Sequence, residues 1–242
     1  MTSTQQYDAM FSGIIGQDYQ MLKLICPYAI EMSRLVAEQV AGTQRPDTPL
    51  TVVELGGGTG ITTLAILIAA DNANVLSVDN EPTMQNQARQ NLQEWSAQGR
   101  LRFSGADALT ALRNLATASI DVLASAYTLH NFPADYRIQV LQEAYRVLVP
   151  GGRFINGDRY ALDDIVTHTR NTQHEVAGYF KVLTDMQRLD LLEHWIIHLF
   201  SDESENYIMR EAEARRQMVA AGFQHIKIHQ RLDVNALLTA EK

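Results

Sequence analysis

The feature that most constrains the fold is an apolar segment, residues 50–55, that runs directly into a glycine-rich turn at residues 56–60. A second apolar stretch, residues 61–70, follows the glycines at once and has the length of a helix. A strand that ends in glycines and leads into a helix presents unpaired backbone N–H groups, and no Cβ keeps a ligand away. The segment therefore predicts a strand–turn–helix unit that binds a nucleotide-like ligand at its turn.

Short apolar strands and helices alternate regularly after this turn. Further strands are predicted at residues 74–78, 101–103, 120–126 and 153–156. The intervening helices are predicted at residues 82–98, 109–115 and 135–148. Strands separated by helices of this length favour a parallel sheet with right-handed crossovers, so the expected fold class is α/β.

The two ends of the chain depart from this alternation. Residues 24–40 carry apolar side chains at helical spacing and predict an N-terminal helical arm. Residues 160–220 show no clear strand and predict two or three helices, and strands resume at 223–229 and 234–239. We interpret the chain as one domain, 1–242, made of an N-terminal helical cap (1–45), a core (46–157 and 205–242) and a helical lid inserted after strand five (158–204).

Charge and cysteine content bear on the class of partner and on the compartment. The net charge is −8 and the 20 Lys and Arg are scattered, which disfavours nucleic acid as a partner. The single cysteine, Cys26, forms neither an intramolecular disulfide nor a cysteine metal cluster, and we expect a buried structural thiol. The longest apolar run covers about half the length of a bilayer span, and the N-terminus shows no secretion leader. We therefore expect a cytoplasmic protein without a membrane segment.

Acidic residues at three successive strand ends make the ligand prediction more specific. Glu54 precedes the glycines and can bond the loop amides. Asp79 ends the second strand, where a carboxylate can accept both ribose hydroxyls, and Asp107 follows the third, where it can accept an adenine amine. The alternative for both aspartates is a helix cap. Ligands of open α/β sheets bind along this edge, so the three acids together favour an adenosyl site.

The glycine spacing weighs against a dinucleotide. Gly56 and Gly58 fit the dinucleotide pattern, but Ile61 stands where the third glycine belongs. The extra glycine is Gly60 instead. This spacing disfavours a nicotinamide-dependent oxidoreductase.

Taken together, the motifs resemble those of the class I S-adenosylmethionine-dependent methyltransferases, in the order and spacing of that family across residues 50–157. They are Glu54-x-Gly56-x-Gly58-x-Gly60, Val78-Asp79-Asn80-Glu81, Gly105-Ala106-Asp107-Ala108, Ile120-Asp121-Val122-Leu123 and Leu148-Val149-Pro150-Gly151-Gly152. The resemblance implies a Rossmann-like, seven-stranded, mostly parallel sheet with its last strand antiparallel.

The resemblance also implies S-adenosylmethionine as cofactor, with S-adenosylhomocysteine as product. It places the glycine turn against the methionyl part, Asp79 on the ribose, Asp107 on the adenine amine, and the backbone of Ala126 and Tyr127 beside the adenosine. The cofactor-binding residues that we expect are Tyr28, Glu54, Gly56, Gly57, Gly58, Gly60, Asp79, Asn80, Asp107, Ala108, Ala126 and Tyr127.

Methyl transfer asks the protein mainly to hold acceptor and methyl group in line and to exclude water. A general base is needed only when the acceptor is protonated. His130, after the fourth strand, is the candidate base or substrate ligand, and a hydrogen bond that fixes the loop is the alternative. Candidate substrate contacts are Tyr19, His174 and Arg188.

Four further residues have a functional interpretation and a plainer alternative. Asp158 and Arg159 follow strand five and could bind a polar acceptor, although a solvated turn is the favoured reading. His194 and His198 have metal-ligand spacing, but Trp195 stands where a zinc protease carries glutamate. We therefore expect no metal site.

The leading hypothesis is a methyltransferase acting on a small-molecule acceptor. Pro27-Tyr28, Asp79-Asn80 and residues 178–188 are somewhat similar to carboxy-S-adenosylmethionine synthases. In those enzymes an arginine matching Arg188 receives the extra carboxylate, but their glycine loop has Cys-Ser near the position of Gly57-Gly58. That activity and a non-catalytic adenosyl-cofactor-binding protein both stay open as alternatives, as does a homodimer.

Overall fold

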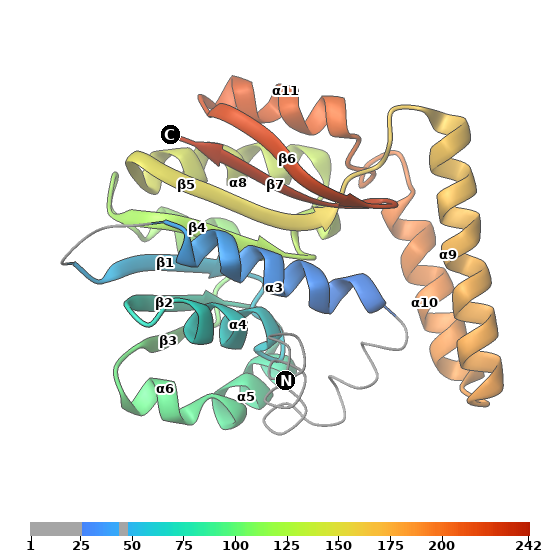
Figure 1. The fold of residues 1–242 in the computed structure, drawn as a ribbon, viewed down its shortest axis with the longest axis horizontal. Helices are drawn as coiled ribbons and strands as arrows, with labels where there is room; N and C mark the ends of the chain where they lie inside the picture. The colour runs from blue at the N-terminus through green and yellow to red at the C-terminus, as the bar shows by residue number, and fades with distance from the viewer. Residues whose placement is uncertain (1–25, 44–47) are drawn as a thin grey trace.

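The computed structural model describes residues 26–43 and 48–242, in which seven strands form one sheet in the order β3-β2-β1-β4-β5-β7-β6 (Figure 1). The strands are β1 (Leu50–Leu55), β2 (Ala73–Val78), β3 (Leu101–Ser104), β4 (Ile120–Ala126), β5 (Leu148–Arg159), β6 (Gln224–Leu232) and β7 (Asn235–Glu241). Strands β1 to β5 pair in parallel, and β7 is antiparallel to both β5 and β6. The predicted α/β, Rossmann-like sheet with an antiparallel last strand is confirmed.

Helices cover both faces of the sheet because its central strands are apolar on both sides. Val52 of β1 packs with α3 and α4, whereas Val53 and Leu55 pack with α7 and α8 on the opposite face. The helices are α3 (Pro27–Ala41), α4 (Ile61–Ala69), α5 (Pro82–Asn91), α6 (Gln93–Ala97), α7 (Ala108–Arg113), α8 (Ala134–Val147), α9 (Ile165–Asp185), α10 (Leu189–Asp202) and α11 (Glu211–Ala221), with a short 3-10 turn, η1 (Leu129–Asn131). Each connection between successive parallel strands, from β1 to β5, thus contains at least one helix, as the alternation predicts.

Several element boundaries differ from the sequence prediction. The helix expected over 82–98 is two helices, because the chain turns at Leu92 to bury that side chain fully beside Gly60. The N-terminal helix begins at Pro27, a favourable first position, rather than at residue 24. The strand expected over 153–156 runs on to Arg159, because residues 157–159 pair with β7.

Helices α9 and α10 form an antiparallel pair that stands beyond the carboxyl ends of the strands, at the right of Figure 1. They carry their own apolar cluster, which consists of Tyr179, Leu183, Leu192 and Leu199. This pair lies within residues 158–204, where we expected a lid, and the division into core and lid stays an interpretation. Helix α3 is a different case, because Met32, Val36 and Val40 are fully buried against the sheet and make it part of the core.

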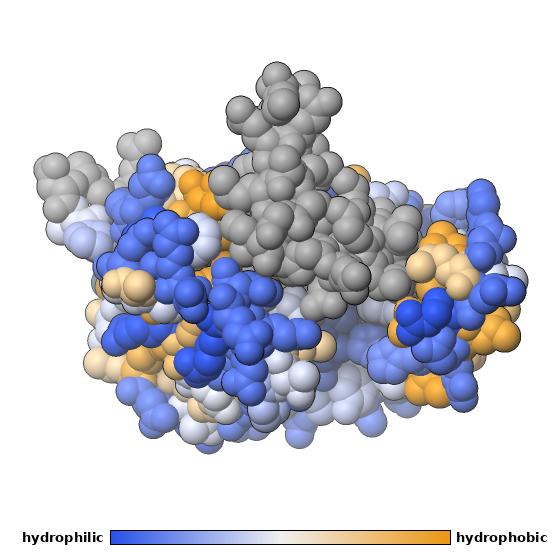
Figure 2. Space-filling model, turned by 90° about the horizontal axis from the view of Figure 1, so that it is seen from below, coloured by the Kyte–Doolittle hydropathy of each residue, from blue (hydrophilic) through white to orange (hydrophobic). Residues whose placement is uncertain are grey.

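Several large apolar side chains of α9 and α10 are exposed. Leu189, Ile197 and Phe200 on α10 are 62%, 60% and 75% exposed, and Phe180 on α9 is 51% exposed. Figure 2 shows hydrophobic residues gathered at this end of the molecule. None of the helices in residues 26–43 and 48–242 combines the length and hydropathy that a membrane crossing requires.

Candidate cofactor and acceptor site

The glycine turn after β1 holds three glycines in the left-handed region, Gly56, Gly58 and Gly60, with φ of 71°, 52° and 97°. A Cβ on Gly56 would lie 1.9 Å from the Thr128 hydroxyl oxygen, so this glycine is required by packing. A Cβ on Gly58 would meet no atom of residues 26–43 or 48–242 within 4 Å. Among these residues, the turn therefore leaves its backbone open at the position where a ligand is predicted.

Glu54 lies buried beneath the turn. Its Oε2 accepts a hydrogen bond from the Thr63 hydroxyl of α4, and its Oε1 has no hydrogen-bond partner among the described residues. Burial raises the pKa of Glu54 to about 7. The sequence predicts hydrogen bonds between this carboxylate and the loop amides. Among the described residues, Glu54 bonds Thr63 instead and so links β1 to α4.

Asp79 directly follows β2 and accepts two backbone amides. Its Oδ2 accepts the Gly58 amide at 2.7 Å and its Oδ1 accepts the Glu81 amide at 2.8 Å. Glu81 caps α5 by accepting the Met84 amide, so the cap is not Asp79. Asp79 is half-buried beside Gly58, and Asn80 next to it is exposed. The carboxylate therefore lies at the glycine turn, as a ribose contact requires.

Asp107, at the third strand end, does cap a helix. Its Oδ1 accepts the Thr110 amide of α7 at 3.0 Å and the Tyr136 hydroxyl at 2.8 Å. Hydrogen bonds, chiefly those from Thr110, lower the pKa of Asp107 to about 2. The bonds from the Thr110 amide and the Tyr136 hydroxyl both go to Oδ1. Ala108 begins α7 directly behind it.

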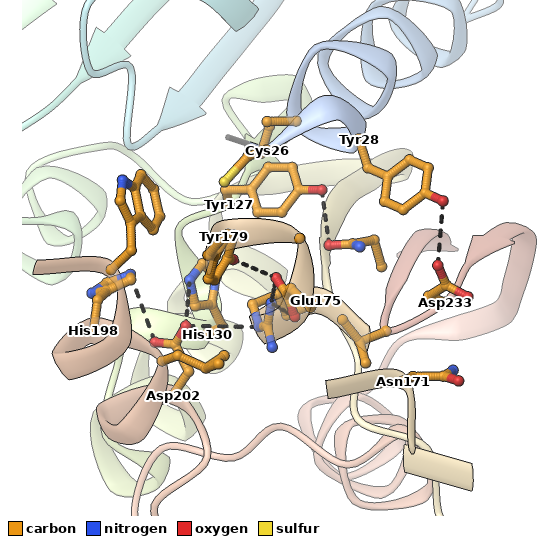
Figure 3. Close-up of a pocket in the computed structure, with 18 of the residues that line it drawn as sticks. Cys26, Tyr28, Tyr127, His130, Asn171, Glu175, Tyr179, His198, Asp202 and Asp233 are labelled. Carbon is orange, nitrogen blue, oxygen red and sulfur yellow. Dashed lines mark hydrogen bonds and ion pairs between the residues drawn. The ribbon is translucent and has the colours of Figure 1, made fainter. Parts of the chain in front are cut away.

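A cavity of about 470 Å³ lies between the carboxyl ends of β4 and β5 and the helices α3, α9 and α10 (Figure 3). It reaches the cofactor edge at Thr62, Ala126 and Tyr127. The predicted residues Tyr28 and His174 line it, and Tyr28 donates its hydroxyl hydrogen to Asp233 at 3.2 Å. The cavity therefore adjoins the predicted adenosyl edge.

Two predicted substrate contacts are not in this cavity. Arg188 is exposed at the start of α10 and bonds Asp190 at 2.7 Å, so the structure does not bring it to the site. Arg188 lies at the N-terminal end of α10, whereas the residues of α10 that line the cavity, Trp195, His198, Leu199 and Asp202, lie in its second half. Tyr19 lies outside the described residues.

His130 lies on η1, directly after β4, with its ring at the cavity. Its Nδ1 is 2.5 Å from Oδ1 of Asp158, which is fully buried at the end of β5. The other oxygen of Asp158 accepts the Leu129 amide at 2.9 Å. Although burial raises it, the charge and hydrogen bond of His130 bring the pKa of Asp158 below its usual value. The expectation of a solvated turn at Asp158 is wrong, because residues 157–159 continue β5 into the interior.

Arg159 joins the strand edge to the helical pair. Its guanidinium bonds Glu175 of α9 at 2.7 Å and Glu203 at 3.1 Å, and its Nε lies 3.7 Å from Asp202 of α10. Its side chain is 11% exposed. The expected solvated turn is wrong here too, for the same reason as at Asp158. Among the described lining residues Arg159 is the one lysine or arginine, and carboxylates already occupy it.

Tyr127, which is predicted to lie beside the adenosine, adopts a left-handed backbone, φ 50°, which is uncommon outside glycine, and its hydroxyl donates to Asn235 at 2.9 Å. The sequence motifs do not place His198 or Asp202 at this site. His198 and Asp202 of α10 face His130 in the cavity, whereas His194 is exposed. The available signal was the four-residue spacing of His198 and Asp202, which puts both on one helix face.

The chain is similar to known proteins in sequence and in structure. A methyltransferase domain family matches residues 52–152, the stretch from β1 into β5. The carboxy-S-adenosyl-L-methionine synthase of Shewanella amazonensis is 25% identical over 162 residues, 66% of this chain and 63% of that protein. The corresponding protein of Escherichia coli is 24% identical over 207 residues, 82% of this chain and 75% of that protein.

Among solved structures, an O-methyltransferase family protein from Burkholderia thailandensis superposes with a TM-score of 0.64 at 18% identity, covering 100% of this chain and 60% of that one. This chain thus spans less than two thirds of the Shewanella and Burkholderia proteins. The structural likeness bears on the fold alone. The matched methyltransferase domain, residues 52–152, contains the glycine turn and its acids, and the sheet order agrees with the fold of the methyltransferase structures.

Proposed function

We propose that this protein transfers a methyl group from S-adenosylmethionine to a small-molecule acceptor bound in the cavity. The observation that carries the proposal is the position of that cavity. It adjoins the adenosyl edge at Ala126 and Tyr127, and α9 and α10 wall it on the opposite side. A walled pocket of this size suits a small molecule better than a polymer.

The donor side is built for an adenosyl group rather than for a phosphate. The open backbone at Gly58 would receive the methionyl part, Asp79 the ribose and Oδ2 of Asp107 the adenine amine. The bound cofactor would supply an activated methyl group on a sulfonium centre. The chain's task is then to orient the acceptor and to keep water out.

His130 is the residue that we assign to the acceptor's proton. Asp158 binds Nδ1, which leaves Nε2 at the cavity to take a proton from an acceptor hydroxyl, amine or thiol. A buried carboxylate behind an imidazole fixes the ring and stabilises its protonated form. As the new bond to the methyl carbon forms and the sulfonium–methyl bond breaks, the acceptor's proton would pass to Nε2.

A carboxy-S-adenosylmethionine synthase is the second candidate, and the curated relatives favour it. Such an enzyme needs a cation for the added carboxylate. Arg188 lies outside the cavity, and the guanidinium of Arg159 is already paired with Glu175 and Glu203. The charges of the described site therefore favour plain methyl transfer.

Mass spectrometry of the ligand released from purified protein separates these functions. Methyl transfer predicts S-adenosylmethionine or S-adenosylhomocysteine, and incubation with acceptor libraries should then yield S-adenosylhomocysteine. Recovery of the carboxylated cofactor would move the assignment to the synthase. Cofactor binding with no turnover on any acceptor class would favour a non-catalytic binding protein.

Two further expectations belong to this proposal. We expect the enzyme to work in the cytoplasm, which fractionation of cells would test. A homodimer is supported by the exposed apolar residues Leu189, Ile197 and Phe200 along α10. Sedimentation of the protein and of an Ile197→Glu, Phe200→Glu variant would test that assembly.

A further inference from the structure

Three side chains with metal-ligand chemistry converge on the lid side of the cavity. His130 comes from η1, and His198 and Asp202 come from α10, 68 or more residues later in the chain. Nε2 of His198 lies 3.7 Å from Oδ1 of Asp202, and Nε2 of His130 lies 3.9 Å from Oδ2. All three ligand atoms lie within 4.8 Å of one another, and Figure 3 shows the group together at the cavity.

Asp202 is the member of this group whose carboxylate has only long contacts. It is 8% exposed, and no described residue gives its carboxylate a hydrogen bond. The two imidazole nitrogens and Nε of Arg159, at 3.7 to 3.9 Å, are all beyond hydrogen-bond distance. Asp202 thus has ion pairs with Arg159 and the two histidines, but each of them is long. This spacing leaves room for one ion between the carboxylate and the two imidazoles.

The donor set fits a divalent transition metal. Ligand atoms that bind one ion at about 2.0–2.2 Å lie roughly 3–4 Å apart, so the three groups would need to close only slightly. Asp158 binds Nδ1 of His130 at 2.5 Å and leaves Nε2 as the free ring nitrogen. A carboxylate behind a ligating histidine is the usual support of metal-bound imidazoles.

We propose that His130, His198 and Asp202 bind one divalent first-row transition metal ion of the Zn²⁺ class. Two imidazoles and one carboxylate suit such ions better than Mg²⁺ or Ca²⁺, which prefer oxygen ligands. Three protein ligands leave a coordination position for water or substrate. This site goes against the expectation of no metal drawn from His194 and His198, because the partners of His198 are His130 and Asp202 instead.

The ion would change how the acceptor is activated, a consequence that rests on the proposed methyl transfer. Nε2 of His130 cannot hold the ion and accept a proton at once. With the ion in place, an acceptor hydroxyl or thiol would lose its proton to solvent on coordination, because a bound cation lowers its pKa. The class of acceptor would then be one with a metal-binding oxygen or sulfur.

The test uses the full chain, treated with a chelator, dialysed and titrated with Co²⁺ or Zn²⁺. We expect one ion per chain by elemental analysis, and visible Co²⁺ absorption bands of the intensity typical of four- or five-coordinate sites. His198→Ala and Asp202→Asn should each weaken binding at least tenfold. His194→Ala is the matched control, because that histidine is exposed on the same helix, and it should bind as the unaltered chain does.

S-adenosylhomocysteine titration and thermal unfolding of each variant separate loss of the ion from loss of the fold. If Asp202→Asn does not fold, His198→Gln serves in its place. Fewer than 0.1 ions per chain, or equal weakening in His194→Ala and His198→Ala, would overturn the metal site. Cofactor binding that persists without metal binding would leave the methyltransferase proposal standing, and metal binding without cofactor binding would do the reverse.

Discussion

The donor edge and the acceptor cavity of this protein are assembled in different ways. Glu54, Gly58, Asp79 and Asp107 stand at the ends of three successive strands, and their contacts join residues close along the chain or in adjacent strands. The acceptor cavity draws on α3, η1, β5, α9, α10 and the β6–β7 turn. Its contacts cross long stretches of sequence, as between Tyr28 and Asp233, which are 205 residues apart.

The two regions also differ in their electrostatics. At the donor edge the described polar contacts of Asp79 and Asp107 are mainly to backbone amides. The cavity instead holds a buried network in which Asp158, Glu175, Asp202 and Glu203 surround Arg159 and several histidines. Backbone contacts thus position the acids of the proposed donor edge, whereas the cavity depends on charge pairing across the helical pair.

The largest expected effect separates chemistry from cofactor binding. His130→Ala should lower the rate of methyl transfer by about 10²–10⁴-fold, because the proton acceptor, or the metal ligand, is lost. Affinity for S-adenosylhomocysteine should stay within twofold, since the donor edge is untouched. Turnover of any identified acceptor, with calorimetry alongside, makes the measurement, and the exposed His225 replaced by Ala is the control. An unchanged rate would remove His130 from the reaction.

The next effect concerns the tie between the sheet and the helical pair. Arg159→Ala should destabilise the protein by about 3–5 kcal/mol, because several carboxylates lose their buried partner. Arg34→Ala, which removes a more exposed pair with Glu31 and Glu38, should cost about 1 kcal/mol or less. Urea unfolding gives both numbers, and hydrogen exchange should show the extra opening in α9 and α10. Equal losses in the two variants would mean that the network does not hold the pair.

At the donor edge, the buried Glu54 predicts a pH dependence. Its pKa is about 7 in the folded chain and 4.5 as the ordinary value, so the group favours folding fully below pH 4.5. That contribution is lost as pH rises to 7, because the unfolded chain ionises first. Relative to Glu54→Gln, the wild-type chain should therefore lose about 3 kcal/mol of stability between pH 4.5 and pH 8. Paired urea titrations at both pH values measure this difference, and a constant difference would mean that the carboxyl ionises freely.

The smallest effect tests the ribose contact. Asp79→Ala should weaken S-adenosylhomocysteine binding at least tenfold, because a charged hydrogen-bond acceptor is lost. Glu81→Ala is matched to it, since Glu81 lies two residues on and caps α5 instead. That variant should bind within twofold of the wild-type chain. Equal affinities for the two variants in calorimetry would end the assignment of Asp79 to the ribose.

The contrast between the regions also explains what could be predicted from the sequence. The sheet, the glycine turn and the positions of Asp79 and Asp107 follow from local motifs and strand–helix alternation. The burial of Asp158 could not be read in this way, because it depends on pairing between β5 and the distant β7. The meeting of His130 with Asp202 likewise requires the fold to bring α10 to η1.

The resemblance was least informative for the charged residues of the cavity. Arg188 matched a family position in sequence, yet it lies at the N-terminal end of α10, away from the lining residues of that helix. The arginine that does reach the site, Arg159, is the last residue of β5, a strand that is longer than the sequence predicts. Side chains of the cavity are thus determined by long-range packing, and a single sequence shows little of it.

We expect the edge from Glu54 to Asp107 to bind an adenosyl methyl donor. Titration calorimetry of the purified chain with S-adenosylhomocysteine, and separately with NAD, measures this binding. We predict one site of micromolar affinity for S-adenosylhomocysteine and no measurable heat with NAD. Binding of NAD without binding of S-adenosylhomocysteine or S-adenosylmethionine would contradict it.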